Sequence, residues 1–241
     1  MDKELIAVMV IWESGDWLKI GPYSFKERFP NIELILIDNS PELDIELKAK
    51  LIIDLGIEII ENTTHLHTHG GGLDFATYIS KEKGYEYMLV LEPDCTFHGT
   101  AIIDHFHDVK SQDWGVMWTH QTACIPHPVF SIWKLDFIEV GDSFESCGRS
   151  EFEKIEAGLI LKSYNDFFYN YFDPAHKLFW KALQQGKCLK AGEWVGRKTG
   201  HHYFRNILSG PDRKTHKTPD DFKKLKNPIL ELLVPVKTIK R

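Results

Sequence analysis

The chain has 241 residues, of which 43% are hydrophobic and 27% charged, and its formal net charge is −6. This composition is typical of a globular protein and excludes a disordered chain, and no apolar run approaches the roughly 20 residues of a membrane-spanning helix. We predict a cytoplasmic protein, because the N-terminus has neither the basic start nor the long apolar core of a secretory signal. Four cysteines without a C-x-x-C pair indicate neither a disulfide framework nor a zinc ribbon.

The charge is unevenly distributed along the chain. Residues 211–241 hold nine Lys or Arg against four Asp or Glu, a local balance of +5, which leaves −11 on the first 210 residues. We therefore predict one domain over residues 1–210 and a basic C-terminal extension over 211–241. The acidic body argues against a nucleic-acid-binding protein. The extension is either a solvated tail or, through its apolar run 229–234, a peripheral contact with an anionic membrane surface.

Short apolar strings recur in the first half of the chain. Their Val, Ile and Leu content is typical of strands buried on both faces of a parallel sheet, and we predict strands at 5–11, 32–37, 57–60 and 87–91. Helices are predicted between them, one from Ser40-Pro41 to Gly56 and one from about Leu73 to Lys83. This alternation predicts βαβ units with a ligand crevice at the carboxyl ends of the strands.

The second half of the chain is less regular. We predict a strand near Trp114–Thr119 and an apolar segment at Val129–Ile138. A capping box at Ser150 and Glu153 predicts one further helix, and Asp173-Pro174 is expected to open the last one. The fold class predicted from these elements is α/β, a single domain whose mostly parallel sheet is flanked by helices.

Carboxylates follow two of the predicted strands. Glu92-Pro93-Asp94 comes directly after the strand 87–91, and Asp38 ends the strand before Ser40. The carboxylate oxygens of Glu92 and Asp94 suit Mg²⁺ or Mn²⁺, which bridge to substrate phosphates. Asp38 could instead form a hydrogen bond with a base or a ribose at the sheet edge. The alternatives are an ordinary acidic turn for Glu92-Pro93-Asp94 and, for Asp38, a brace for the turn that follows it.

A loop rich in histidine and glycine follows the third predicted strand, from His65 to Gly72. Its three adjacent glycines allow close approach of a ligand, and the helix start that follows offers N–H groups to a phosphate. The spacing matches neither G-x-G-x-x-G nor a Walker A motif, which disfavours a dinucleotide or P-loop enzyme. The H-x-H-x-H pattern is compatible with a zinc site or with surface and substrate-facing histidines.

The order of these motifs resembles a family 2 type glycosyltransferase of the GT-A fold: a strand ending in D-N-S, a glycine-rich loop that opens a helix, and a strand ending in L-E-P-D. Val140–Glu145 is similar to the V-G-x-F-D/E segment of that family. Asp173–Gly186 resembles its acidic-residue, helix and glycine block, and Gly200–His202 resembles its late histidine. The resemblance covers roughly Ile6 to Asn206.

The resemblance implies a GT-A-like domain that moves a sugar from a nucleotide-diphosphate sugar donor to a glycan or lipid-linked acceptor, with inversion and with the help of Mn²⁺ or Mg²⁺. The residues that it implies for donor binding are Trp12, Glu13, Asp38, Gly72, Glu92 and Asp94. It further implies metal ligands at Asp94 and His202 and a catalytic base at Asp173. The sequence departs from the family pattern in Glu92, which is longer than the usual Asp, and in Leu73-Asp74, which replaces the usual Arg-Asn.

Two other functions stay open. One is a non-catalytic module of the same fold that binds carbohydrate or nucleotide sugar, and the other is a sugar nucleotidyltransferase, although the acidic loop 12–16 argues against triphosphate binding. Structural roles also stay open for individual residues. Asp173 before Pro174 is a good helix N-cap, His201 and His202 could form a buried pair, and the aromatic run 167–172 suits either a sugar ring or the core.

Overall fold

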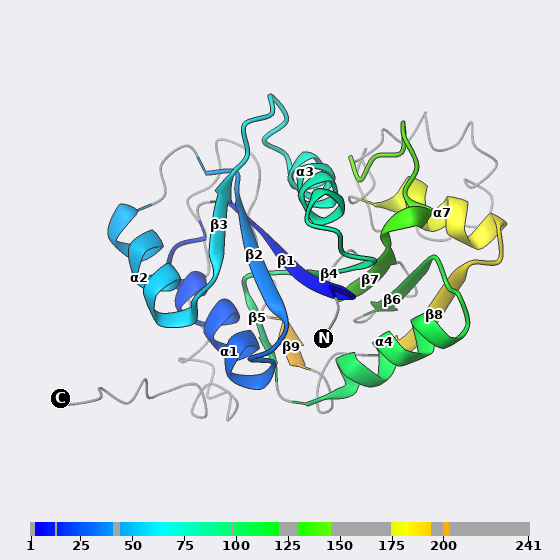
Figure 1. Cartoon of the computed structure of the whole chain (residues 1–241), viewed down its shortest axis with the longest axis horizontal. Coiled ribbons are helices and arrows are strands. Elements are labelled where there is room, and N and C mark those ends of the chain that lie inside the picture. The colour runs from blue at the N-terminus through cyan, green and yellow to red at the C-terminus, as the bar shows by residue number, and fades with distance from the viewer. Residues whose placement is uncertain are drawn as a thin grey trace, which may run out of the picture.

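The computed structural model describes residues 3–12, 14–40, 44–97, 99–120, 130–145, 175–193 and 200–202. Its centre is a seven-stranded sheet of order β3-β2-β1-β4-β7-β6-β8, beside a two-stranded sheet β5-β9 (Figure 1). The strands are β1 (Leu5–Ile11), β2 (Glu33–Asp38), β3 (Glu58–Glu61), β4 (Tyr87–Leu91), β5 (Cys95–Phe97), β6 (Val116–His120), β7 (Ser131–Lys134), β8 (Cys188–Glu193) and β9 (Gly200–His202). Within the large sheet only β7 runs antiparallel to its neighbours, among the pairs that the structure describes, so the mostly parallel α/β sheet is confirmed.

Helices cover both faces of the large sheet (Figure 1). They are α1 (Gly21–Arg28), α2 (Ile45–Leu55), α3 (His69–Glu82), α4 (Ala101–Ser111) and α7 (His176–Gln184), with short 3₁₀ turns η1 (Gly15–Lys19) and η2 (Leu135–Phe137). Alternate residues of β1 point to opposite faces: Met9 belongs to the core under α1, α2 and α4, and Val8 belongs to the core under α3 and α7. The continuous apolar run of β1 is therefore explained by burial on both sides.

The boundaries of two helices differ from the sequence-based prediction at their starts. Helix α2 ends at Gly56, which adopts a left-handed φ of 62° as expected of a stop residue, but its N-cap is Asp44 rather than Ser40. Asp44 satisfies the helix start because its side chain accepts hydrogen bonds from the amides of Glu46 and Leu47. Helix α3 begins at His69, so the three glycines form its first turn and are not a loop before it.

Several predicted elements cannot be compared with the structure. The helix expected at Ser150 and the basic extension 211–241 lie outside the described residues. In the part of the chain that is described, no helix combines the length and the apolar character needed to cross a membrane.

The aromatic core beneath α7 gives a first test of the fold. Phe144 is fully buried, and its ring centroid lies 4.9 Å from that of Trp133. The substitution Phe144→Ala removes this contact and leaves a cavity, so we expect the free energy of unfolding to fall by about 3–5 kcal/mol in urea denaturation. Val140→Ala, at a fully exposed side chain, is the control and should change it by less than about 0.5 kcal/mol. Equal losses in both variants would contradict this packing.

Candidate active site

The carboxyl ends of β1, β2 and β4 meet at one edge of the large sheet. Ile11 at the end of β1 is in register with Asp38 of β2, and Met9 is in register with Leu91 of β4. Strand β2 lies on one side of β1, and β4 lies on the other side. The strand order thus reverses at β1, and open α/β sheets bind ligands at such a topological switch point. The candidate site is therefore placed at this edge.

Most of the predicted donor-binding residues belong to segments at this edge. They are Trp12, Asp38, Gly72, Glu92 and Asp94. Glu13 and the predicted base Asp173 lie outside the described residues. His202 belongs to β9, where the structure describes the backbone.

Asp38 is buried, with 2% of its surface exposed, and both of its carboxylate oxygens have partners within the protein. The amide of Ser40 donates to Oδ1 at 2.9 Å, which is the turn-bracing contact considered for this residue. The ammonium of Lys48 on α2 lies 2.6 Å from Oδ2. A ligand that reaches the end of β2 therefore meets an existing ion pair.

The Glu92-Pro93-Asp94 turn is supported from α1. A Cβ on Gly21 would lie 2.1 Å from the carbonyl oxygen of Pro93, so only glycine permits this contact of α1 with the turn. The hydroxyl of Ser24 accepts a hydrogen bond from the amide of Phe97 at 2.7 Å, which fixes the strand that follows. Asp94 is 3% exposed and Glu92 is partly exposed.

Strand β9 brings the predicted histidines to this turn. Cys95 is in register with His202, and Thr96 with His201, in the antiparallel pair β5-β9. The partner of His202 is thus the residue that directly follows Asp94. The backbone places the late histidine pair of the sequence beside the acidic turn, although the two segments are far apart in the sequence (Figure 1).

The first turn of α3 packs against β1 and against the segment that carries Glu145. A Cβ on Gly70 would lie 2.5 Å from the Cα of Glu145, and one on Gly72 would lie 2.5 Å from the side chain of Val10 on β1. Thr68 caps the helix by accepting a hydrogen bond from the amide of Gly71, and its hydroxyl donates to the carboxylate of Glu145. The glycines therefore serve close packing, and Glu145 lies where a phosphate was predicted to contact the helix start.

Two buried asparagines that the sequence reasoning did not single out hold the loop before α3. Asn62 donates to the side chain of Asn39 at 2.7 Å and to the carbonyl of Leu66 at 3.0 Å. Asn39 donates to the carbonyl of Thr68 at 2.7 Å. Each asparagine follows directly after a strand, β2 or β3, so a polar residue at the end of an apolar run was the available signal.

Only one histidine of the H-x-H-x-H loop has a described contact with the acidic turn. Nε2 of His69 lies 3.6 Å from Oε1 of Glu92, whereas His65 and His67 are exposed. No three His, Cys, Asp or Glu side chains within the described ranges are grouped closely enough to bind a metal by themselves. The zinc alternative for this loop therefore has no support from the described residues.

Asp74, which follows the glycines of α3, binds the segment that precedes Glu145. Its two carboxylate oxygens accept hydrogen bonds from the amide of Phe144 at 2.7 Å and from the hydroxyl of Ser143 at 2.6 Å. Burial raises the pKa of the Asp74 carboxyl above its usual value, although both hydrogen bonds act in the opposite direction. Asp74 thereby positions the segment that carries Glu145.

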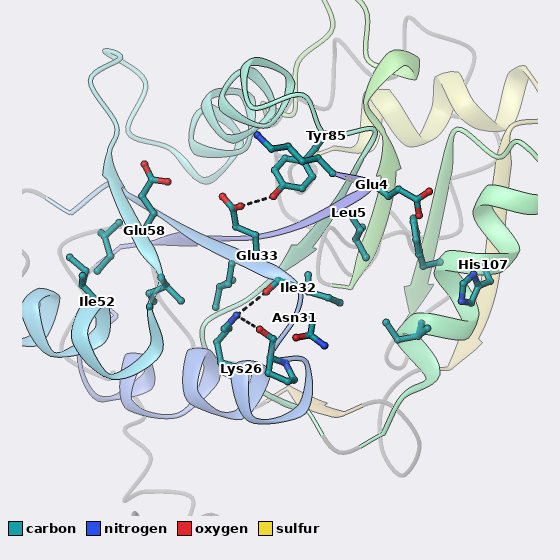
Figure 2. Close-up of a pocket in the computed structure, with 18 residues that line it drawn as sticks. Glu4, Leu5, Lys26, Asn31, Ile32, Glu33, Ile52, Glu58, Tyr85 and His107 are labelled. Atoms are coloured by element: carbon teal, nitrogen blue, oxygen red, sulfur yellow. Dashed lines mark hydrogen bonds between the residues drawn. The ribbon is translucent and has the colours of Figure 1, made fainter. Parts of the chain in front are cut away.

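A cavity of about 720 Å³ lies at the opposite edge of the sheet, around the amino ends of β1, β2 and β3 (Figure 2). Some of its polar groups are already paired within the cavity. Lys26 donates to the carbonyls of Pro30 and Ile32 at 2.9 and 3.0 Å, and Glu33 accepts from Tyr85 at 2.5 Å. We keep the candidate site at the carboxyl edge, because the carboxylates of Asp38, Glu92 and Asp94 gather there.

No protein-family model matches the sequence, and no curated protein does. Solved structures do match. Residues 1–349 of S. aureus TarS in complex with UDP-GlcNAc give a TM-score of 0.52 at 11% identity, covering 98% of this chain and 68% of that one. The galactosyltransferase LgtC, in complex with donor and acceptor sugar analogues, gives 0.52 at 11% identity, covering 96% and 97%.

A third match is a putative nucleotide-diphospho-sugar transferase from Desulfovibrio desulfuricans G20, with a TM-score of 0.52 at 8% identity, covering 97% of this chain and 99% of that one. The chain spans only 39% of a longer TarS structure. At these identities the likeness establishes the fold, which is GT-A-like, and confirms that part of the expectation. Membership of family 2 remains a resemblance.

The buried Asp74 carboxyl predicts a pH effect on stability. Because its pKa is raised in the folded state, the folded chain binds the proton more tightly than the unfolded chain, and stability is lost as the pH rises from the unfolded value of 3.8 through the folded one. Asp74→Asn keeps the shape but has no titrating group. We expect the unfolding free energy of the native chain to fall relative to that of the variant between pH 4 and neutrality. A constant difference in chemical denaturation series would contradict this assignment.

Proposed function

We propose that this chain is a glycosyltransferase that moves a sugar from a nucleotide-diphosphate sugar to an acceptor hydroxyl. The main support is the placement of three segments at the carboxyl edge of a GT-A-like sheet. They are the Glu92-Pro93-Asp94 turn after β4, the end of β2, and β9, which pairs with β5 directly after that turn. The structures with this fold include a complex with UDP-GlcNAc and one with donor and acceptor sugar analogues. The acceptor proposed for this chain is a glycan or a lipid-linked sugar.

The transfer needs a base and a leaving group. The acceptor oxygen forms a bond to the anomeric carbon, the bond from that carbon to the diphosphate oxygen breaks, and the diphosphate keeps the electron pair. We propose that Asp173 takes the acceptor proton and that the transfer inverts the anomeric centre. The helix that follows Asp173 in the sequence supports this, because the amide of Ala175 donates to the carbonyl of Phe144 at 2.8 Å, next to Glu145.

The described residues fit a divalent cation that is shared with the donor. Mg²⁺ and Mn²⁺ are usually held by one or two carboxylates together with substrate phosphates, so a complete set of protein ligands is not required. Asp94 would hold the ion, with His202 as a second ligand and Glu92 beside it. When bound, such an ion supplies positive charge opposite the departing diphosphate. The −11 charge of residues 1–210 disfavours binding of an anionic donor, and a cation bound at this edge would offset that repulsion.

The basic extension 211–241 is proposed as a peripheral membrane contact that would bring the site to a lipid-linked acceptor. Its charge balance of +5 supports attraction to anionic headgroups. No nucleic acid is proposed as a partner.

The metal assignment is tested by removing one charge. Asp94→Asn keeps the size of this buried side chain, and we expect it to weaken Mn²⁺-dependent binding of UDP or GDP at least tenfold in isothermal titration calorimetry, because the carboxylate is the proposed ligand. Asp136→Asn, at an exposed residue of η2, is the matched control and should bind as the native chain does. Metal-independent binding of equal strength in the native chain and in Asp94→Asn would move the site elsewhere.

The two histidines of β9 can be separated by the same measurement. The sequence favours His202 as the ligand, so His202→Ala should lower the apparent affinity for Mn²⁺ in the presence of nucleotide, and His201→Ala should leave it within about twofold. Circular dichroism controls for loss of the short strand. The opposite ranking of the two variants would assign the metal to His201.

A second candidate function is a non-catalytic module that binds nucleotide sugars. The engagement of both Asp38 oxygens by protein groups favours it, since a residue with the family's binding role is already occupied. Donor hydrolysis separates the two functions. A transferase is expected to release sugar slowly from its donor when water replaces the acceptor, whereas complete absence of hydrolysis and transfer, with binding intact, would favour the module.

A further inference from the structure

We propose that Lys48, held by Asp38, is the residue that contacts the base of the nucleotide, and that it selects bases carrying a carbonyl at this position. The inference rests on the proposed function and deepens it by naming the class of base. Asp38 then acts as a positioning residue for Lys48.

The geometry of the pair assigns these roles. The Asp38 side chain is 1% exposed and that of Lys48 is 30% exposed, at an Nζ–Oδ2 distance of 2.6 Å. The other Asp38 oxygen is engaged by the amide of Ser40. Of the two groups, the ammonium is thus the one that a ligand at the end of β2 can reach, and its position is fixed by a buried carboxylate.

The chemistry of an ammonium group sets the selectivity. It has three donors and no acceptor, so the ion pair with Asp38 leaves it able to donate to a further partner. Uracil and guanine offer a carbonyl oxygen at O4 and O6, whereas cytosine and adenine carry an amino group at the equivalent positions. When an amino group of the base faces Lys48, an N–H of the base and an N–H of the ammonium point at each other without an acceptor. This disfavours binding of CDP and ADP.

A carboxylate contact would predict a different pattern. If Asp38 itself bound the base, it would accept from amino groups of cytosine and adenine as readily as from ring N–H groups. Lys48 would then compete with the ligand for Asp38, and its removal would strengthen binding. If Lys48 instead contacted the diphosphate, its removal would weaken all nucleotides equally.

The experiment is calorimetric titration of the full chain with UDP, GDP, CDP and ADP in the presence of Mn²⁺. We expect the tighter of UDP and GDP to bind at least tenfold more tightly than CDP and ADP. Lys48→Met should reduce this preference at least fivefold, mainly by weakening UDP or GDP. Lys50→Met, at an exposed lysine of the same helix, is the matched control and should keep the full preference.

Because Lys48→Met leaves a buried carboxylate without its cation, that variant can lose stability. The double variant Asp38→Asn with Lys48→Met removes both charges, retains an oxygen for the Ser40 amide, and should show the same loss of preference. Three results would overturn the inference alone. They are stronger nucleotide binding in Lys48→Met, equal weakening of all four nucleotides in that variant, and binding of CDP or ADP to the native chain as tight as that of UDP and GDP. Failure of all four to bind would overturn the proposed function together with it.

Discussion

The close packing of the first turn of α3 is the constraint on which the candidate site depends. This turn touches β1 through Gly72 and the backbone of Glu145 through Gly70. A side chain at either position would separate elements that must lie within van der Waals contact. Since the same turn begins with His69, the helix that closes the packing also places an imidazole near Glu92. The residues that allow the close packing, Gly70 and Gly72, and the histidine that lies near Glu92 thus belong to the same helix turn.

The negative charges at the carboxyl edge of the sheet are in two different environments. At the end of β2 a cation of the chain itself, Lys48, meets Asp38. At the end of β4 the effect of the carboxylates is visible on Cys95, whose pKa is raised well above its usual value by burial and by the negative charges of Asp94 and Glu92. Both effects disfavour the thiolate form of Cys95, which is the nucleophilic one. This turn suits a cation that arrives with the substrate.

The sequence was sufficient to predict the elements whose signals are local. The strands β1 and β4 were predicted at their observed bounds, because long apolar runs buried on both faces have no strong competitor. The start of α2 was missed because Ser40 and Asp44 are both good caps. The amide of Ser40 instead donates to Asp38 in a local turn, and Asp44 accepts the hydrogen bonds of the helix start. Strands β5 and β9 have three residues each, too few for a periodic pattern, and the reversed direction of β7 is not encoded in four residues.

The site itself was predictable in part for the same reason. Polar residues directly after apolar strands indicated Asp38, Glu92 and Asp94 at the carboxyl edge. Their partners come from helices and distant loops, and the pairing of Lys48 with Asp38 or of Asp74 with Ser143 depends on the packed structure. The sequence marked Asp74 only as a departure from the pattern of the family that it resembles, whereas the structure shows that Asp74 binds the neighbouring segment at Ser143 and Phe144.

The pairing of β5 with β9 has a consequence for the order in which the protein matures. During synthesis the N-terminal part of a chain is available first, and contacts between distant segments form last. The strands β1 to β4 can assemble the edge that carries Asp38 while residues 200–202 are still inside the ribosome. The histidine-bearing strand can join Cys95–Phe97 only after residues 200–202 have also been translated. A newly made chain would therefore form the edge proposed to bind the nucleotide before it gains the histidine proposed to complete the metal site.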